Sequence, residues 1–129
     1  MCTNARMLGW LVAMLGLAVP LHAEIWYVTP TGTGIGTGGW GNACSLQTAL
    51  AGSADNDSIW VAQGTYKPSV IYPSGTDNRR KTFRIPPNRL VYGGFVGIST
   101  ETDLTHRNPE ANETILDGDI GTANDSSDN

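Results

Sequence analysis

The sequence contains few of the residues from which most catalytic and metal sites are built. Its 129 residues include two cysteines and two histidines, and only 16% of them are charged. Cys2 lies in an N-terminal leader, so Cys44 is the single thiol expected in the mature chain. One thiol cannot form an internal disulfide, and no nearby histidine or second cysteine gives it a metal-binding spacing. Our interpretation of Cys44 is a small buried hydrophobe; a partner for a cysteine elsewhere in a longer chain and a reactive thiol are the alternatives.

The sequence also lacks an excess of positive charge. Eight lysines and arginines stand against 12 aspartates and glutamates, for a net charge of −4. Proteins that bind nucleic acid normally carry a basic face, so this balance argues against a nucleic-acid partner. The single basic run, Arg79-Arg80-Lys81, follows Ser74, Gly75, Asp77 and Asn78. We interpret it as a solvated loop in preference to an anion site.

No apolar run is long enough to cross a membrane as a helix. The longest, Met7 to Val19, has 13 residues, whereas a spanning helix needs about 20. Arg6 precedes this run and Pro20 follows it, which is the order of a secretory signal peptide. We therefore assign residues 1–23 as a signal peptide cut before Glu24, with a cut after Ala18 as the alternative. The mature chain is expected to be exported, to lack a transmembrane helix, and to be extracellular or associated with the outer membrane or cell surface.

Residues 30–39 are rich in glycine and threonine. They offer little side chain to bury, so we expect an exposed loop. A phosphate-binding loop is excluded, because no Lys-Ser/Thr pair follows the glycines and the next residue is Trp40.

The rest of the mature chain predicts one helix and several short strands. The helix covers Ser45–Ala54, with Leu46, Ala49 and Leu50 on one face. Strands are expected where β-branched and aromatic residues lie between turn formers, at Ile25–Val28, Ser58–Ala62, Thr82–Ile85, Arg89–Tyr92 and Thr114–Leu116. Ile59 and Phe83 are 24 residues apart, and Leu90 and Ile115 are 25 apart. Intervals of this size suggest the stacked coils of a solenoid.

Several short motifs occur in a characteristic order along the chain. They are Trp26-Tyr-Val28, Trp40-Gly-Asn-Ala43, Leu46-Gln-Thr-Ala-Leu50, Asp57-Ser-Ile-Trp-Val-Ala62, Gly64-Thr-Tyr-Lys-Pro68, Tyr92-Gly-Gly-Phe95 and Thr114-Ile-Leu-Asp-Gly-Asp-Ile120. This series resembles the N-terminal region of bacterial right-handed parallel β-helix proteins. The group in question is pectin-lyase-like and includes polymorphic outer-membrane-protein-like and choice-of-anchor surface proteins.

The resemblance implies an all-β fold, the start of a right-handed parallel β-helix (a solenoid) with a short N-terminal capping α-helix. Residues 24–129 would be this cap and the first two to three coils, with strands Ile59–Val61, Leu90–Tyr92 and Ile115–Leu116 stacked one above another. Gly93 and Gly94 would mark a tight bend that has no room for a Cβ. Arg107 would form a structural salt bridge rather than contact a ligand. Such proteins continue for further coils, so the chain is expected to be truncated at its C-terminus and to be a fragment of a longer protein.

The acidic C-terminal stretch is the one candidate metal site. Asp117, Asp119, Asp125 and Asp128 fall at positions 1, 3, 9 and 12 of a calcium-loop pattern, although Thr122 stands where such loops have glycine. A solvated turn is the alternative interpretation, and no other cofactor is expected.

No catalytic constellation is recognised. Glu101 and Asp103 are interpreted as solvated carboxylates in a polar loop, and His106 as a surface histidine without a nucleophile beside it. We expect a secreted or cell-surface β-helix module with a structural or adhesive role, in contact with polysaccharide or a cell-surface glycan. The alternative is the N-terminal fragment of a polysaccharide lyase or glycoside hydrolase of the pectin-lyase-like fold.

Overall fold

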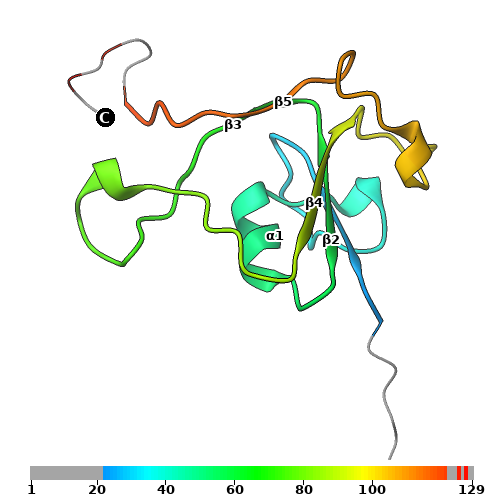
Figure 1. The fold of residues 1–129 in the computed structure, drawn as a ribbon, viewed down its shortest axis with the longest axis horizontal. Helices are drawn as coiled ribbons and strands as arrows, with labels where there is room; N and C mark the ends of the chain where they lie inside the picture. Colours follow the sequence, from blue (N-terminus) through cyan, green and yellow to red (C-terminus); the bar gives the residue numbers. More distant parts are fainter. Residues whose placement is uncertain (1–21, 122–124, 126, 128–129) are drawn as a thin grey trace, which may run out of the picture.

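The computed structural model describes residues 22–121, 125 and 127 (Figure 1). The signal peptide lies almost entirely outside these residues, so its assignment stays a prediction. Within the described chain no helix is long and apolar enough to span a bilayer. The elements are β1 (Ile25–Val28), η1 (Trp40–Asn42), α1 (Leu46–Gly52), β2 (Ser58–Ala62), β3 (Gly64–Tyr66), η2 (Asn78–Arg80), β4 (Leu90–Phe95), η3 (Leu104–His106) and β5 (Thr114–Leu116).

Three strands form a parallel sheet in the order β1-β2-β4. Ile25 pairs with Ser58 and Ser58 pairs with Leu90, and a bulge between Trp60 and Ala62 shifts the register at the end of β4. The predicted bounds of β1, β2 and β5 are confirmed, as is the parallel pairing of the 58–62 and 90–92 segments. The predicted helix is also confirmed, since Ser45 caps α1 by accepting a hydrogen bond from the Thr48 N–H.

Side chains alternate between the two faces of this sheet, and the central strand β2 is buried on both of them. One face packs against α1, through Leu46, Ala49 and Leu50, and contributes Val28, Ile59 and Val61 to that core. The other face meets η1 in an aromatic cluster of Trp40, Trp60 and Phe95, with Tyr27 and Tyr92 at its border. Figure 1 shows α1 and η1 on opposite sides of β2 and β4. Complete burial of one such side chain, as at Phe95, contributes about 3 kcal/mol to the free energy of folding.

The expectation of a right-handed parallel β-helix is wrong. The described chain is a small fold of mixed short strands in two parallel sheets, with few helices, and it contains no solenoid. The third stacking strand, β5, pairs with β3 in a separate two-stranded sheet instead of with β4. The helix does not act as a lid on the end of a stack, because its apolar face packs on the side chains of β1 and β2.

The spacing argument failed because one of its strands does not exist. Residues 82–86 have no regular structure, although Phe83 packs against the α1 core. They belong to an excursion of the chain, residues 67–88, which leaves the core after β3 and returns at β4 (Figure 1). A single antiparallel bridge, between Ile71 and Lys81, closes this excursion on itself.

The glycine-rich segment is more ordered than its composition suggests. Backbone hydrogen bonds hold this segment to β1 and to the residues that follow η1. The Tyr27 N–H donates to the Gly36 carbonyl over 2.7 Å, and the Gly34 N–H donates to the Ala43 carbonyl over 2.8 Å. A Cβ on Gly34 would lie 2.3 Å from the Asn42 carbonyl oxygen. The segment is largely exposed, as expected, with Ile35 70% exposed and Gly36 buried. Its glycines also permit close backbone packing along the outer edge of β1, which the sequence did not predict.

Candidate binding groove and the polar network beside it

A groove of about 350 Å³ lies between α1 and the excursion. Four of the side chains that line it are apolar, Leu50 and Ala51 of the helix and Val70 and Pro86 of the excursion. Polar side chains complete the lining, namely Gln47, Tyr72, Thr82 and Arg84. A lining of apolar side chains with a few convergent polar groups, at the lower end of the usual volume of ligand sites, is the typical form of a small-ligand pocket.

Gln47 fixes the groove by joining its two walls. Its Oε1 accepts hydrogen bonds from the N–H groups of Ser69 and Val70, at 3.2 and 3.1 Å. Its Nε2 donates to the Thr82 carbonyl at 3.5 Å. The polar atoms of Gln47 are thus used in holding the excursion to α1, so this residue shapes the groove.

Tyr72 and Arg84 stand at the rim. The Arg84 guanidinium lies 4.5 Å from the centroid of the Tyr72 ring, at the distance of a cation–π contact. Tyr72 is 49% exposed. Within the described chain no hydrogen bond engages the Tyr72 hydroxyl, the Thr82 hydroxyl or the Arg84 guanidinium, so all three can serve a ligand.

The basic run 79–81 lies at the far end of the excursion, and Arg79 and Arg80 are exposed, as expected for a solvated loop, whereas Lys81 is half-buried. Asp77 caps η2 by accepting from the Arg79 N–H, and its carboxylate lies 3.6 Å from the Arg79 side chain. Neither Arg79 nor Arg80 lines the groove.

The calcium candidates are only partly within the described residues, since Asp128 lies outside them. Asp117 accepts a hydrogen bond from the Asp119 N–H and lies 3.6 Å from Lys67, whereas Asp125 accepts from Ser127. No three acidic, histidine or cysteine side chains in the described chain are grouped as a metal site would require.

Glu101 corrects another interpretation. It is 5% exposed, and its carboxylate accepts hydrogen bonds from the N–H groups of Val96, Gly97 and Ile98. Asp103 caps η3, and its carboxylate lies 3.3 Å from His106. With its oxygens occupied by backbone donors, Glu101 is a structural carboxylate and not half of an acid–base pair.

Arg107 and Cys44 have structural positions. Arg107 forms no salt bridge within the described residues, contrary to expectation: its Nε donates to the Gly93 carbonyl over 2.7 Å, and its guanidinium lies 5.1 Å from the Tyr92 ring centroid. Cys44 is buried and unpaired, as expected. Burial raises the pKa of its thiol, which leaves it protonated and unreactive near neutral pH.

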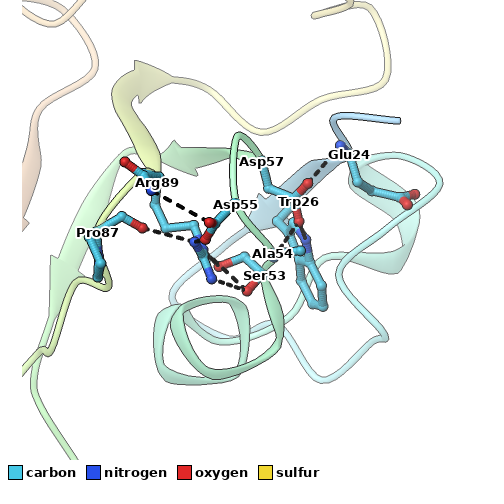
Figure 2. A network of polar contacts seen from close by, with 9 residues as sticks. Glu24, Trp26, Ser53, Ala54, Asp55, Asp57, Pro87 and Arg89 are labelled. Carbon is cyan, nitrogen blue, oxygen red and sulfur yellow. Dashed lines mark hydrogen bonds and ion pairs between the residues drawn. The ribbon is translucent and has the colours of Figure 1, made fainter. Parts of the chain in front are cut away.

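A polar network at the other end of α1 was missed by sequence reasoning (Figure 2). Arg89 donates to the Ser53 and Pro87 carbonyls and forms an ion pair with Asp55. Asp57 accepts from Glu24, Trp26 and Ala54. Asp55-Asn56-Asp57 has the composition of a turn, and residue types alone do not distinguish a buried carboxylate in a turn from a solvated one.

No family model, no curated protein and no solved structure matches this chain. Its function therefore has to be inferred from its own geometry.

Proposed function

We propose that this chain is an exported surface module that contacts glycans through the groove between α1 and the 67–88 excursion. The observation that carries the proposal is the half-exposed Tyr72 ring, which lines the groove together with four apolar side chains and with Arg84 and Thr82. A sugar ring has apolar C–H faces and polar hydroxyl edges. Because the Arg84 guanidinium already lies over one face of the Tyr72 ring, a sugar would pack against the opposite face of this flat, apolar ring.

The polar groups of the rim suit the hydroxyl edges of the same ligand. The Arg84 guanidinium carries five N–H donors in a planar fork, and the hydroxyls of Thr82 and Tyr72 can each donate or accept. The leader predicted in residues 1–23 supports export to the compartment in which such ligands occur. The small size of the groove favours contact with one or two sugar units of a larger polymer, which suits an adhesive role.

The test is binding of the mature chain, Glu24–Asn129, to an array of neutral and acidic oligosaccharides, followed by titration of the strongest ligand by calorimetry. Tyr72→Ala should weaken binding about tenfold, equivalent to about 1.4 kcal/mol, because the packing face is lost. Tyr72→Phe keeps that face and should retain most of the affinity.

Ile35→Ala is the matched control, since Ile35 is 70% exposed but does not line the groove. It should bind as the unchanged chain does. Absence of binding across the array, or equal affinities for Tyr72→Ala and Ile35→Ala, would exclude the groove as a glycan site.

A further inference from the structure

Asp57 is a buried carboxylate in the turn that leads into β2. It is 4% exposed. Its Oδ1 accepts from the backbone nitrogen of Glu24 over 2.9 Å, and its Oδ2 accepts from Trp26 Nε1 over 3.0 Å and from Ala54 N–H over 2.7 Å. Burial alone would raise the pKa of Asp57, but the donors from Ala54, Glu24 and Trp26 outweigh it and hold the pKa below its usual value. Asp57 is therefore a buried negative charge.

The direct partners of this charge are all neutral. Arg89, the nearest cation in the network, is bonded to Asp55, Ser53 and Pro87, and it acts on Asp57 only at longer range. A buried ion without a bonded counter-ion is unusual, because desolvation of a charge is costly unless the charge is paired. The remaining charged groups in the network are the Asp55 carboxylate and the exposed side chain of Glu24, both of which are acidic (Figure 2).

The one partner of Asp57 that can gain a charge is the nitrogen of Glu24. The two described residues before it, His22 and Ala23, are exposed, lie outside any helix or strand, and form no hydrogen bond to the described domain. The bond between Ala23 and Glu24 is also the bond at which the leader is expected to be cut. Ala23 therefore lies outside the hydrogen-bonded fold, whereas Glu24 is held on both sides, since its nitrogen donates to Asp57 and its carbonyl accepts from the Ser58 N–H.

We propose that Asp57 is the receptor for the amino terminus created when the leader is removed between Ala23 and Glu24. Water adds across the Ala23–Glu24 peptide bond: the C–N bond breaks, the hydroxyl goes to the Ala23 carbonyl carbon and a hydrogen goes to the Glu24 nitrogen. At neutral pH the new amine takes up a further proton, and the new carboxyl of Ala23 releases one. The Glu24 nitrogen then faces Asp57 as an ammonium and turns a neutral hydrogen bond into an ion pair, which is shorter and stronger.

This inference rests on the export proposed above, and it also distinguishes the two candidate cleavage positions. A cut after Ala18 would leave Glu24 as an internal amide and would give Asp57 no counter-ion. A cut after Ala23 would add the ion pair between the new ammonium and Asp57, so the mature chain would be more stable than its precursor.

The test compares three forms of the chain: one that begins at Glu24 with a free amine, the same chain with an acetylated amine, and one that begins at Ala23. At pH 6.5 the free-amine form should have the highest thermal midpoint, by about 5 °C. An α-amine held by a carboxylate has its pKa raised above the usual value of about 7.7 to 8.0. The advantage is therefore complete below the unfolded pKa and is lost as pH rises through the folded pKa.

Two variants check the partner. Asp57→Asn should abolish the difference between the free and acetylated forms, whereas Glu24→Gln keeps the amine and should preserve the difference. Direct titration of the α-amine by NMR tests the same ion pair in the unsubstituted chain, where no substitution can disturb folding. Equal midpoints for the free and acetylated forms, or an α-amine that titrates at its usual pH, would overturn the receptor role.

Mass spectrometry of the secreted chain tests the processing step separately. An amino terminus at Glu24 supports the assignment, and a terminus at another residue or retention of the leader overturns it. Neither outcome depends on glycan binding, so failure of the groove and failure of this inference can be distinguished.

Discussion

At the scale of single residues, the clearest difference between sequence and structure is Glu101, which was expected to be solvated and is buried. Burial would raise the pKa of this carboxyl, but the N–H groups of Ile98, Val96 and Gly97 outweigh it and hold the pKa below its usual value. Its neighbours in sequence are polar, which suggested a solvated position. Burial was decided by the path of the 96–98 backbone, and that path cannot be read from residue types.

Replacement of Glu101 by glutamine tests its role. The amide keeps the size of the side chain but presents N–H groups toward backbone donors, so at least one charge-assisted hydrogen bond is lost. We expect the free energy of unfolding to fall by about 2 kcal/mol, measured by urea denaturation. Glu110→Gln removes the same charge from an exposed position and should change stability by less than about 0.5 kcal/mol. Equal effects of the two substitutions would contradict the structural role of Glu101.

At the scale of elements, the strands that the sequence predicted correctly are those with runs of β-branched and aromatic residues between turn formers. Ser58–Ala62 is the clearest case. β3 was missed because Gly64-Thr-Tyr66 is short and begins with glycine, and it is a strand only because β5 lies beside it. Thr82–Ile85 has the composition of a strand but finds no partner, since strand propensity expresses itself only within a sheet.

The glycine pair in β4 was predicted correctly as a place without room for a Cβ. Gly94 has φ of +91°, and a Cβ there would lie 2.9 Å from Pro109. We expect Gly94→Ala to lower the free energy of unfolding by about 2 kcal/mol or more, through strain and contact together. Gly118→Ala is the control, since nothing lies within 4 Å of the position that a Cβ would take there. The midpoints of thermal unfolding of the two variants are compared. A Gly94→Ala midpoint equal to that of Gly118→Ala would exclude the clash.

At the scale of the whole molecule, the sequence predicted parallel strand pairing but not the architecture. The stacking of Ile59–Val61 on Leu90–Tyr92 was implied by the resemblance of short local motifs, and it is the part of that expectation that the structure confirms. The burial of β2 on both faces depends on where α1 and η1 pack, and the groove depends on the contact of Gln47 with residues more than 20 positions away. Such long-range contacts leave no periodic signal in one sequence.

The two buried carboxylates predict how stability depends on pH. Asp57 and Glu101 both have folded pKa values below their usual ones, so their stabilisation is present above the unfolded values of about 3.9 and 4.3. It is lost as pH falls through the folded values. We expect a thermal midpoint that is nearly constant from about pH 7 to pH 5 and falls steeply below about pH 4, measured by circular dichroism. Glu101→Gln should flatten this fall, and a variant as acid-sensitive as the unchanged chain would contradict the assignment.

The closure of β1 by its own glycine-rich segment limits how copies of this protein can join through the three-stranded sheet. A sheet with two unpaired edge strands can add copies indefinitely, as in a fibril, because each added copy exposes another unpaired edge strand. Within the described chain the outer side of β1 is already hydrogen-bonded to residues 36 and 44, and the Gly93 and Gly94 carbonyls of β4 accept from Arg107 and Asn108. A new strand can therefore be recruited only beside residues 90–92 of β4. If two copies paired through β4, the open edge of each copy would be occupied, and this sheet could grow no further than a dimer.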